Sequence, residues 1–130
     1  MKKIVFILLL VSSLFANYMA PMHVPGSQLI DSKKAYEMFN NGVKFIDVRP
    51  DRFVKNGKIK NAYHLYVGSF SKKNLNSIVK QNEDMVIYCN GQRCPLTAEA
   101  IEKAVEYGYT KIYYYRDGYP SWNHYKFPIE

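Results

Sequence analysis

Hydrophobic positions along the chain fall into two kinds of segment, which alternate. Short apolar runs, typical of buried strands in a parallel sheet, lie at residues 43–48, 85–88 and 111–115. Segments with apolar residues at helical spacing lie at residues 31–40, 71–80 and 95–107. This alternation predicts an α/β fold with a mainly parallel central sheet of about five strands and helices on both faces.

Shorter elements complete the predicted domain, which spans residues 28–130. Residues 28–30 and 62–65 are predicted strands, and residues 53–57 a brief helical turn. Residues 119–125 are predicted to form a short helix whose Trp122 enters the core. At 130 residues the chain has room for one domain with a substantial core.

The first residues have the pattern of an export signal. Lys2 and Lys3 precede an unbroken apolar run at residues 4–11, and small residues follow. The run is too short to span a bilayer, which takes about 20 residues, so residues 1–16 are predicted to be a signal peptide. Cleavage is expected after Ala16, with Ala20 as the second choice, which leaves no stable membrane insertion. An uncleaved anchor is the alternative.

An exported chain in a bacterium would be periplasmic, where disulfides form and persist. Residues 17–27 contain Pro21, Pro25 and Gly26 and are predicted to be an extended linker into the fold. Loss of residues 1–16, which hold two lysines and no acidic residue, would lower the formal net charge from +7 to +5. A moderately basic protein attracts small anions. No nucleic-acid motif accompanies the scattered basic residues, so no nucleic-acid partner is expected.

The candidate active site is the tight loop from Cys89 to Cys94, which holds both cysteines of the chain. A strand precedes the loop, and Pro95 follows it at the first position of a predicted helix, where proline is favoured. A thiol at a strand end would face the positive end of that helix and its unpaired N–H groups. At helix N-termini, cysteine pKa values fall to about 3.5–7.5, against about 8.5 for a free thiol.

The other loop residues suit an anion. Gly91 permits positive φ, which lets successive N–H groups point inward, and Arg93 adds a permanent charge with a forked donor geometry. From these residues alone, three interpretations stay open. Cys89 is a nucleophile, or it is a small buried hydrophobic residue, or it forms a disulfide with Cys94.

Three ordered stretches, within residues 28–128, resemble the rhodanese-like sulfurtransferases. The loop at residues 88–95 is similar to the family's active-site loop. The family's Asp-Val-Arg signature and the residues after it resemble Phe45-Ile46-Asp47-Val48-Arg49 with Phe53, Gly57, Ile59 and Ala62. Its closing strand, glycine turn and Trp helix resemble Gly108-Tyr109, residues 112–118 and Trp122. The chain departs from the family at Lys58, where His is usual, and at Lys60-Asn61, where Pro-Gly is usual.

The resemblance implies a thiosulfate sulfurtransferase-like enzyme. Cys89 would take a sulfane sulfur from thiosulfate or a similar small anionic donor, and would pass it from a persulfide to a thiol or cyanide acceptor. The backbone N–H groups of Asn90, Gly91, Gln92, Arg93 and Cys94 would bind the terminal sulfur, and Arg93 would steady the donor. Asp47 and Arg49 are expected to organise the loops beneath the site through buried ion pairing.

Two alternatives remain to this enzyme. One is a non-catalytic or redox module in which Cys89 and Cys94 form a stable disulfide. Between this module and the enzyme lies the possibility that Cys94 attacks a Cys89 persulfide, which releases sulfide and leaves a disulfide for a thiol reductase to reopen. The other is a Cys-based phosphatase, disfavoured because the loop is short and Pro95 stands six positions after Cys89. Neither an organic cofactor nor a metal is expected, since two cysteines five apart on one tight loop make a poor zinc pair.

Overall fold

The computed structural model describes residues 18–130, so the predicted signal peptide lies outside the described residues. Five parallel strands form one sheet in the order β1-β5-β4-β2-β3. They are β1 (Ser27–Leu29), β2 (Lys44–Asp47), β3 (Tyr63–His64), β4 (Met85–Tyr88) and β5 (Ile112–Tyr115). The predicted five-stranded parallel sheet is therefore confirmed.

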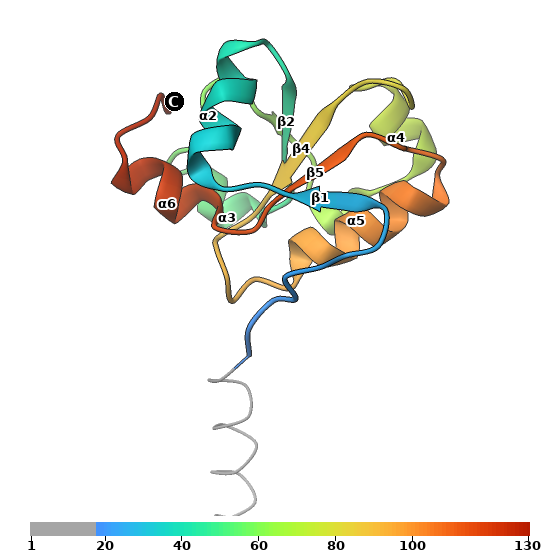
Figure 1. Ribbon diagram of the computed structural model, residues 1–130, viewed down its shortest axis with the longest axis horizontal. Coiled ribbons are helices and arrows are strands. Elements are labelled where there is room, and N and C mark those ends of the chain that lie inside the picture. The colour runs from blue at the N-terminus through green and yellow to red at the C-terminus, as the bar shows by residue number, and fades with distance from the viewer. Residues whose placement is uncertain (1–17) are drawn as a thin grey trace, which may run out of the picture.

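Helices cover both faces of the sheet (Figure 1), as the sequence predicted. One face is packed by α2 (Ser32–Asn40) and α6 (Gly118–His124), and the other by α4 (Lys72–Asn76) and α5 (Leu96–Glu106). The short elements α3 (Asp51–Val54) and η1 (Val67–Ser69) lie in the connections that flank β3.

The central strand β4 divides the core between the two faces. Its side chains alternate, as strand geometry requires: Val86 and Tyr88 join the cluster under α2 and α6, while Met85 and Ile87 join the cluster under α5. Continuing this alternation, Cys89 falls on the α5 side. Trp122 is fully buried on the opposite side among the rings of Tyr36, Phe39, Phe45, Tyr115 and Phe127.

The predicted helix at residues 71–80 is wrong over its second half. Helix α4 ends at Asn76, where the Ser77 hydroxyl donates to the carbonyl oxygen of Asn74. The chain then turns so that Val79 is buried, and the Val79 carbonyl oxygen accepts a hydrogen bond from the Tyr109 hydroxyl. After Asn76 turn hydrogen bonds continue, from the Ile78 and Val79 amides to the Leu75 carbonyl oxygen. Strand β1 also begins one residue earlier than predicted.

The described part of the predicted linker packs against the domain. Ala20 and Val24 are each only 3% exposed. The Ala20 amide donates to the Gln92 carbonyl oxygen at 2.7 Å, and Arg116 donates to the Ala20 carbonyl oxygen through Nε and Nη2. The Tyr114 hydroxyl donates to the Pro21 carbonyl oxygen. Residues 20–24 therefore belong to the fold, and Ala20 contacts the 89–94 loop. In residues 18–130, no helix has the length and apolar character needed to cross a membrane.

Helix α5 depends on its buried face for stability. Ile101 is fully buried against the sheet, and we expect Ile101→Ala to lower the free energy of unfolding by about 2–5 kcal/mol, because the lost methylene groups leave a cavity. Urea unfolding followed by Trp122 fluorescence measures this change. Glu102→Ala, at the next and exposed position, should stay within about 0.5 kcal/mol of the parent. Equal effects of the two substitutions would contradict the assigned face of α5.

Candidate active site

The carboxyl ends of the parallel strands bring the candidate residues to one edge of the sheet. Asp47, Tyr88 and Tyr115 are register partners at the last positions of β2, β4 and β5. Cys89 follows Tyr88 directly, and Arg49 lies two residues beyond Asp47. In open α/β sheets, ligands bind at this edge.

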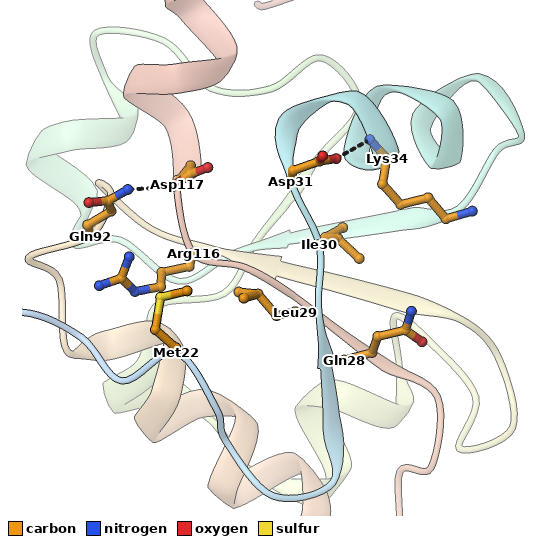
Figure 2. Close-up of a pocket in the computed structure, with 9 residues that line it drawn as sticks. All are labelled: Met22, Gln28, Leu29, Ile30, Asp31, Lys34, Gln92, Arg116 and Asp117. Carbon is orange, nitrogen blue, oxygen red and sulfur yellow. Dashed lines mark hydrogen bonds between the residues drawn. The ribbon is translucent and has the colours of Figure 1, made fainter.

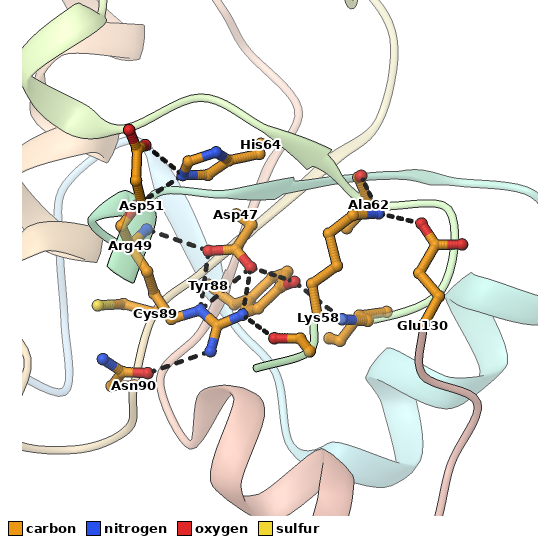
Figure 3. A network of polar contacts seen from close by, with 12 residues as sticks. Asp47, Arg49, Asp51, Lys58, Ala62, His64, Tyr88, Cys89, Asn90 and Glu130 are labelled. Carbon is orange, nitrogen blue, oxygen red and sulfur yellow. Dashed lines mark hydrogen bonds and ion pairs between the residues drawn. The ribbon is translucent and has the colours of Figure 1, made fainter. Parts of the chain in front are cut away.

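A buried ion pair underlies the loop. The Asp47 side chain is fully buried and the Arg49 side chain is 2% exposed. Their carboxylate and guanidinium groups make three hydrogen bonds, the shortest 2.7 Å from Arg49 Nη2 to Asp47 Oδ2 (Figure 3). The Arg49 backbone amide donates to Asp47 Oδ1 as well. The sequence-based prediction of a buried Asp47–Arg49 pair agrees with this geometry.

The Arg49 guanidinium joins four separate segments. Besides Asp47, it donates to the Gly57 carbonyl oxygen at 2.7 Å and to Asn90 Oδ1 at 3.4 Å (Figure 3). Its Cζ also lies 4.3 Å from the centre of the Tyr119 ring, a cation–π contact. The side chain of Asn90, which was predicted as a substrate-binding residue, is thus bound to the buried Arg49 guanidinium.

Tyr88 completes this network, although nothing in the local sequence pattern distinguishes it from an ordinary buried strand residue. Its hydroxyl donates to Asp47 Oδ2 at 2.7 Å and accepts from the Ile59 amide. Burial, reinforced by the Asp47 carboxylate, raises the pKa of Tyr88 far above its usual value. The hydroxyl therefore keeps its proton and stays a donor to Asp47.

The two cysteines of the loop form a disulfide. Cys89 and Cys94 are joined, with their Cα atoms 6.3 Å apart. Cys89 is 1% exposed, whereas Cys94 is half-buried. The prediction of Cys89 as a free, accessible nucleophile does not describe this oxidised state, because the Cys89 sulfur is bonded to Cys94 and the residue is buried. Nucleophilic chemistry at Cys89 requires reduction first.

The backbone between the cysteines is a compact turn. Gly91 has φ +111°, in the region that favours glycine. The Cys94 amide donates to the Gly91 carbonyl oxygen at 3.0 Å, so this predicted donor closes the turn in the oxidised state. Gln92 and Arg93 are exposed at the tip, and the Gln92 side chain donates to Asp117 Oδ1.

Gly118 and Tyr119 hold the start of the loop from the other side. The Tyr119 amide donates to the Cys89 carbonyl oxygen at 2.9 Å. A Cβ atom on Gly118 would lie 2.3 Å from that same oxygen and 2.8 Å from the Gly91 nitrogen. The sequence marked residues 116–118 only as a turn, and nothing in the local pattern reveals this close approach.

Two open pockets flank the loop. One, of about 440 Å³, is lined by Asn90, Gly91, Gln92, Asp117, Pro120 and Ser121. The other, of about 590 Å³, lies between the N-terminal segment, β1 and Arg116 (Figure 2). Its charged lining residues are Asp31, Lys34, Arg116 and Asp117, so its lining has no excess of either charge. Among the residues that the structure describes, no group of three or more His, Cys, Asp or Glu side chains could hold a metal ion.

The sequence model of the rhodanese-like domain matches residues 31–125. The chain belongs to the rhodanese-like domain family. No curated protein matches the chain.

Solved structures of proteins from three bacteria share the rhodanese-like fold. A protein from Bacillus halodurans is 17% identical with a TM-score of 0.71, over 79% of this chain and 76% of that one. The rhodanese-like domain of an Anabaena protein is 18% identical with a TM-score of 0.68, over 78% and 77% of the two chains. A Rhodopseudomonas palustris protein of unknown function, named as a possible tyrosine phosphatase, is 21% identical with a TM-score of 0.63, over 79% and 84%.

The ion pair of this rhodanese-like domain should be essential for stability. We expect Arg49→Met to lower the free energy of unfolding by about 3–5 kcal/mol, because it leaves the Asp47 carboxylate buried without its partner. Urea unfolding of the oxidised protein at neutral pH tests this. Arg52→Met removes an exposed guanidinium over the Phe53 ring and should cost only about 0.5–1 kcal/mol. A small effect at Arg49 would mean that solvent reaches the pair.

Two alanine substitutions separate the effect of the close contact at Gly118 from the effect of its positive φ. Gly118 and Gly42 have φ of +63° and +78°, but a Cβ on Gly42 would meet nothing within 4 Å. Gly42→Ala should therefore cost about 1–2 kcal/mol from the left-handed backbone alone. Gly118→Ala should cost clearly more, because the added methyl group would press on the Cys89 carbonyl. Urea unfolding measures both changes in the free energy of unfolding. Equal changes would show that the 89–94 loop can move away from the added methyl group without loss of stability.

Proposed function

We propose that this protein is a sulfurtransferase that moves a sulfane sulfur from thiosulfate or a similar anion to a thiophilic acceptor through a Cys89 persulfide. The observation that carries the proposal is the placement of Cys89. It lies at the carboxyl end of the central strand, at the start of the 89–94 loop and above the buried Asp47–Arg49 pair. Membership of the rhodanese-like family supports the same assignment.

The reaction begins from the reduced protein. The Cys89 thiolate attacks the outer sulfur of thiosulfate, the sulfur–sulfur bond of thiosulfate breaks, and sulfite leaves with the electron pair. A thiol or cyanide then accepts the outer sulfur of the persulfide. This is covalent catalysis by an activated nucleophile.

The surroundings of Cys89 favour an anion once the disulfide is open. Helix α5 begins at Leu96, two residues after Cys94, so the positive end of its dipole adjoins the loop. Gly91 gives the loop a backbone that can aim N–H groups at a terminal sulfur, and Arg93 supplies charge for the donor. A pocket lined by Asn90, Gly91 and Gln92 lies beside the loop and has room for a small anion.

Export belongs to the proposal as well. Residues 1–16 would direct the chain to the periplasm, where the Cys89–Cys94 disulfide would form readily. A thiol reductase would then be a required partner, since only the reduced loop has a nucleophile.

The disulfide favours a second candidate function. A redox or binding module would keep Cys89–Cys94 as a permanent bond, and the protein would not respond to thiosulfate. Phosphatase activity, suggested only by the name given to the Rhodopseudomonas palustris protein, is a weaker candidate. The Cys94–Pro95 sequence closes the loop within six residues of Cys89 and puts no arginine at its end.

Persulfide formation distinguishes these functions. After reduction and removal of the reductant, the protein should release sulfite when mixed with thiosulfate, and Cys89→Ser should release none. Aryl phosphate should not be hydrolysed by either form. Thiol counting by mass spectrometry before reduction reports the disulfide. A reduced protein that ignores thiosulfate would favour the redox module, and turnover of aryl phosphate would favour the phosphatase.

A further inference from the structure

The position of Cys94 next to Cys89 suggests a second step in the proposed reaction. Cys94 lies within bonding distance of Cys89 Sγ, since the two sulfurs are covalently joined. In the disulfide-bonded loop, the Cys94 amide also donates a hydrogen bond to the Gly91 carbonyl oxygen. A free thiol at Cys94 is therefore placed to attack Cys89 Sγ when Cys89 carries an extra sulfur atom.

We propose that Cys94 is a resolving thiol, and that the protein reduces thiosulfate to sulfite and hydrogen sulfide with electrons from a dithiol. This inference rests on the proposed Cys89 persulfide. It adds an activity that needs no external sulfur acceptor. The acceptor for the second half of the reaction is built into the loop.

The cycle has three balanced steps. In the first, Cys89 takes the outer sulfur of thiosulfate and sulfite leaves. In the second, the Cys94 thiolate attacks Cys89 Sγ, the bond from Sγ to the outer sulfur breaks, and the outer sulfur leaves as hydrosulfide. The two cysteines lose two electrons and the sulfane sulfur gains them. In the third, an external dithiol reduces the Cys89–Cys94 disulfide and becomes a disulfide itself.

Burial decides which sulfur the dithiol attacks. Cys89 is 1% exposed, whereas Cys94 is half-buried at the edge of the domain. Thiol–disulfide exchange depends on access to the attacked sulfur and on the stability of the leaving thiolate. Access favours attack at Cys94, and this attack releases Cys89 as the thiolate. The reductant thus returns Cys89 directly to its reactive form.

A single-turnover experiment tests the resolving role. The full chain is reduced with a dithiol, freed of reductant without oxygen, and mixed with excess thiosulfate in the absence of cyanide. The wild-type protein should release one sulfite and one sulfide per chain, and its mass should fall by two hydrogen atoms. Cys94→Ser should release sulfite, lose the sulfide release, and gain one sulfur atom on Cys89.

The outcomes separate this inference from the proposed function. Sulfite without sulfide from the wild-type protein, with the extra sulfur kept on Cys89 or moved to Cys94, overturns the resolving role and leaves the sulfurtransferase intact. No sulfite from the reduced wild-type protein overturns both. Because the mass of the wild-type protein alone decides between these results, the test stands even if Cys94→Ser folds poorly.

A second measurement tests the direction of reduction. The oxidised protein is treated briefly with limiting glutathione, and the free thiols are alkylated and mapped. Glutathione should be found on Cys94 and the alkyl group on Cys89. The reverse pattern would overturn the assignment of Cys94 as the sulfur that meets the reductant.

Discussion

The buried pair of Asp47 and Arg49 is the interaction on which the candidate site depends. Removing two charges from water is costly, and the cost is offset only when the remaining polar atoms have partners. Here the partners are Tyr88, Gly57 and Asn90. Each of them belongs to a different stretch of the chain, so satisfying one ion pair also fixes the positions of β4, the loop after α3, and the base of the cysteine loop.

The cysteine loop is held at its start and at its tip by contacts from outside the loop. Arg49 holds Asn90 from below, the Tyr119 amide holds the Cys89 carbonyl, and the Ala20 amide holds the Gln92 carbonyl. These contacts come from three regions that are distant in sequence. A loop fixed in this way can keep its shape while the bond between its two sulfurs opens and closes, which the proposed cycle demands.

Local patterns predicted the elements that depend on local forces. The apolar run at residues 85–88 and the helical spacing after Pro95 predicted β4 and α5 with accurate bounds, because burial and helix periodicity decide both. The predicted 71–80 helix was too long: α4 ends at Asn76, and the Val79 carbonyl oxygen, thirty residues from Tyr109 in sequence, accepts a hydrogen bond from the Tyr109 hydroxyl. The roles of Tyr88, Gly118 and Ala20 were missed, since each is set by a partner distant in sequence. The Cys89–Cys94 bond could be named from the sequence only as one of three interpretations.

The contact between Ala20 and Gln92 links the predicted cleavage position to the candidate site. A signal peptidase that cut after Ala16 would leave Ala20 in the chain, with its amide on the loop and its carbonyl on Arg116. A cut after Ala20 would discard both groups and put a charged amino terminus at Pro21. In the proposed exported protein, the position of the cut would therefore decide whether the contact between Ala20 and the 89–94 loop is kept.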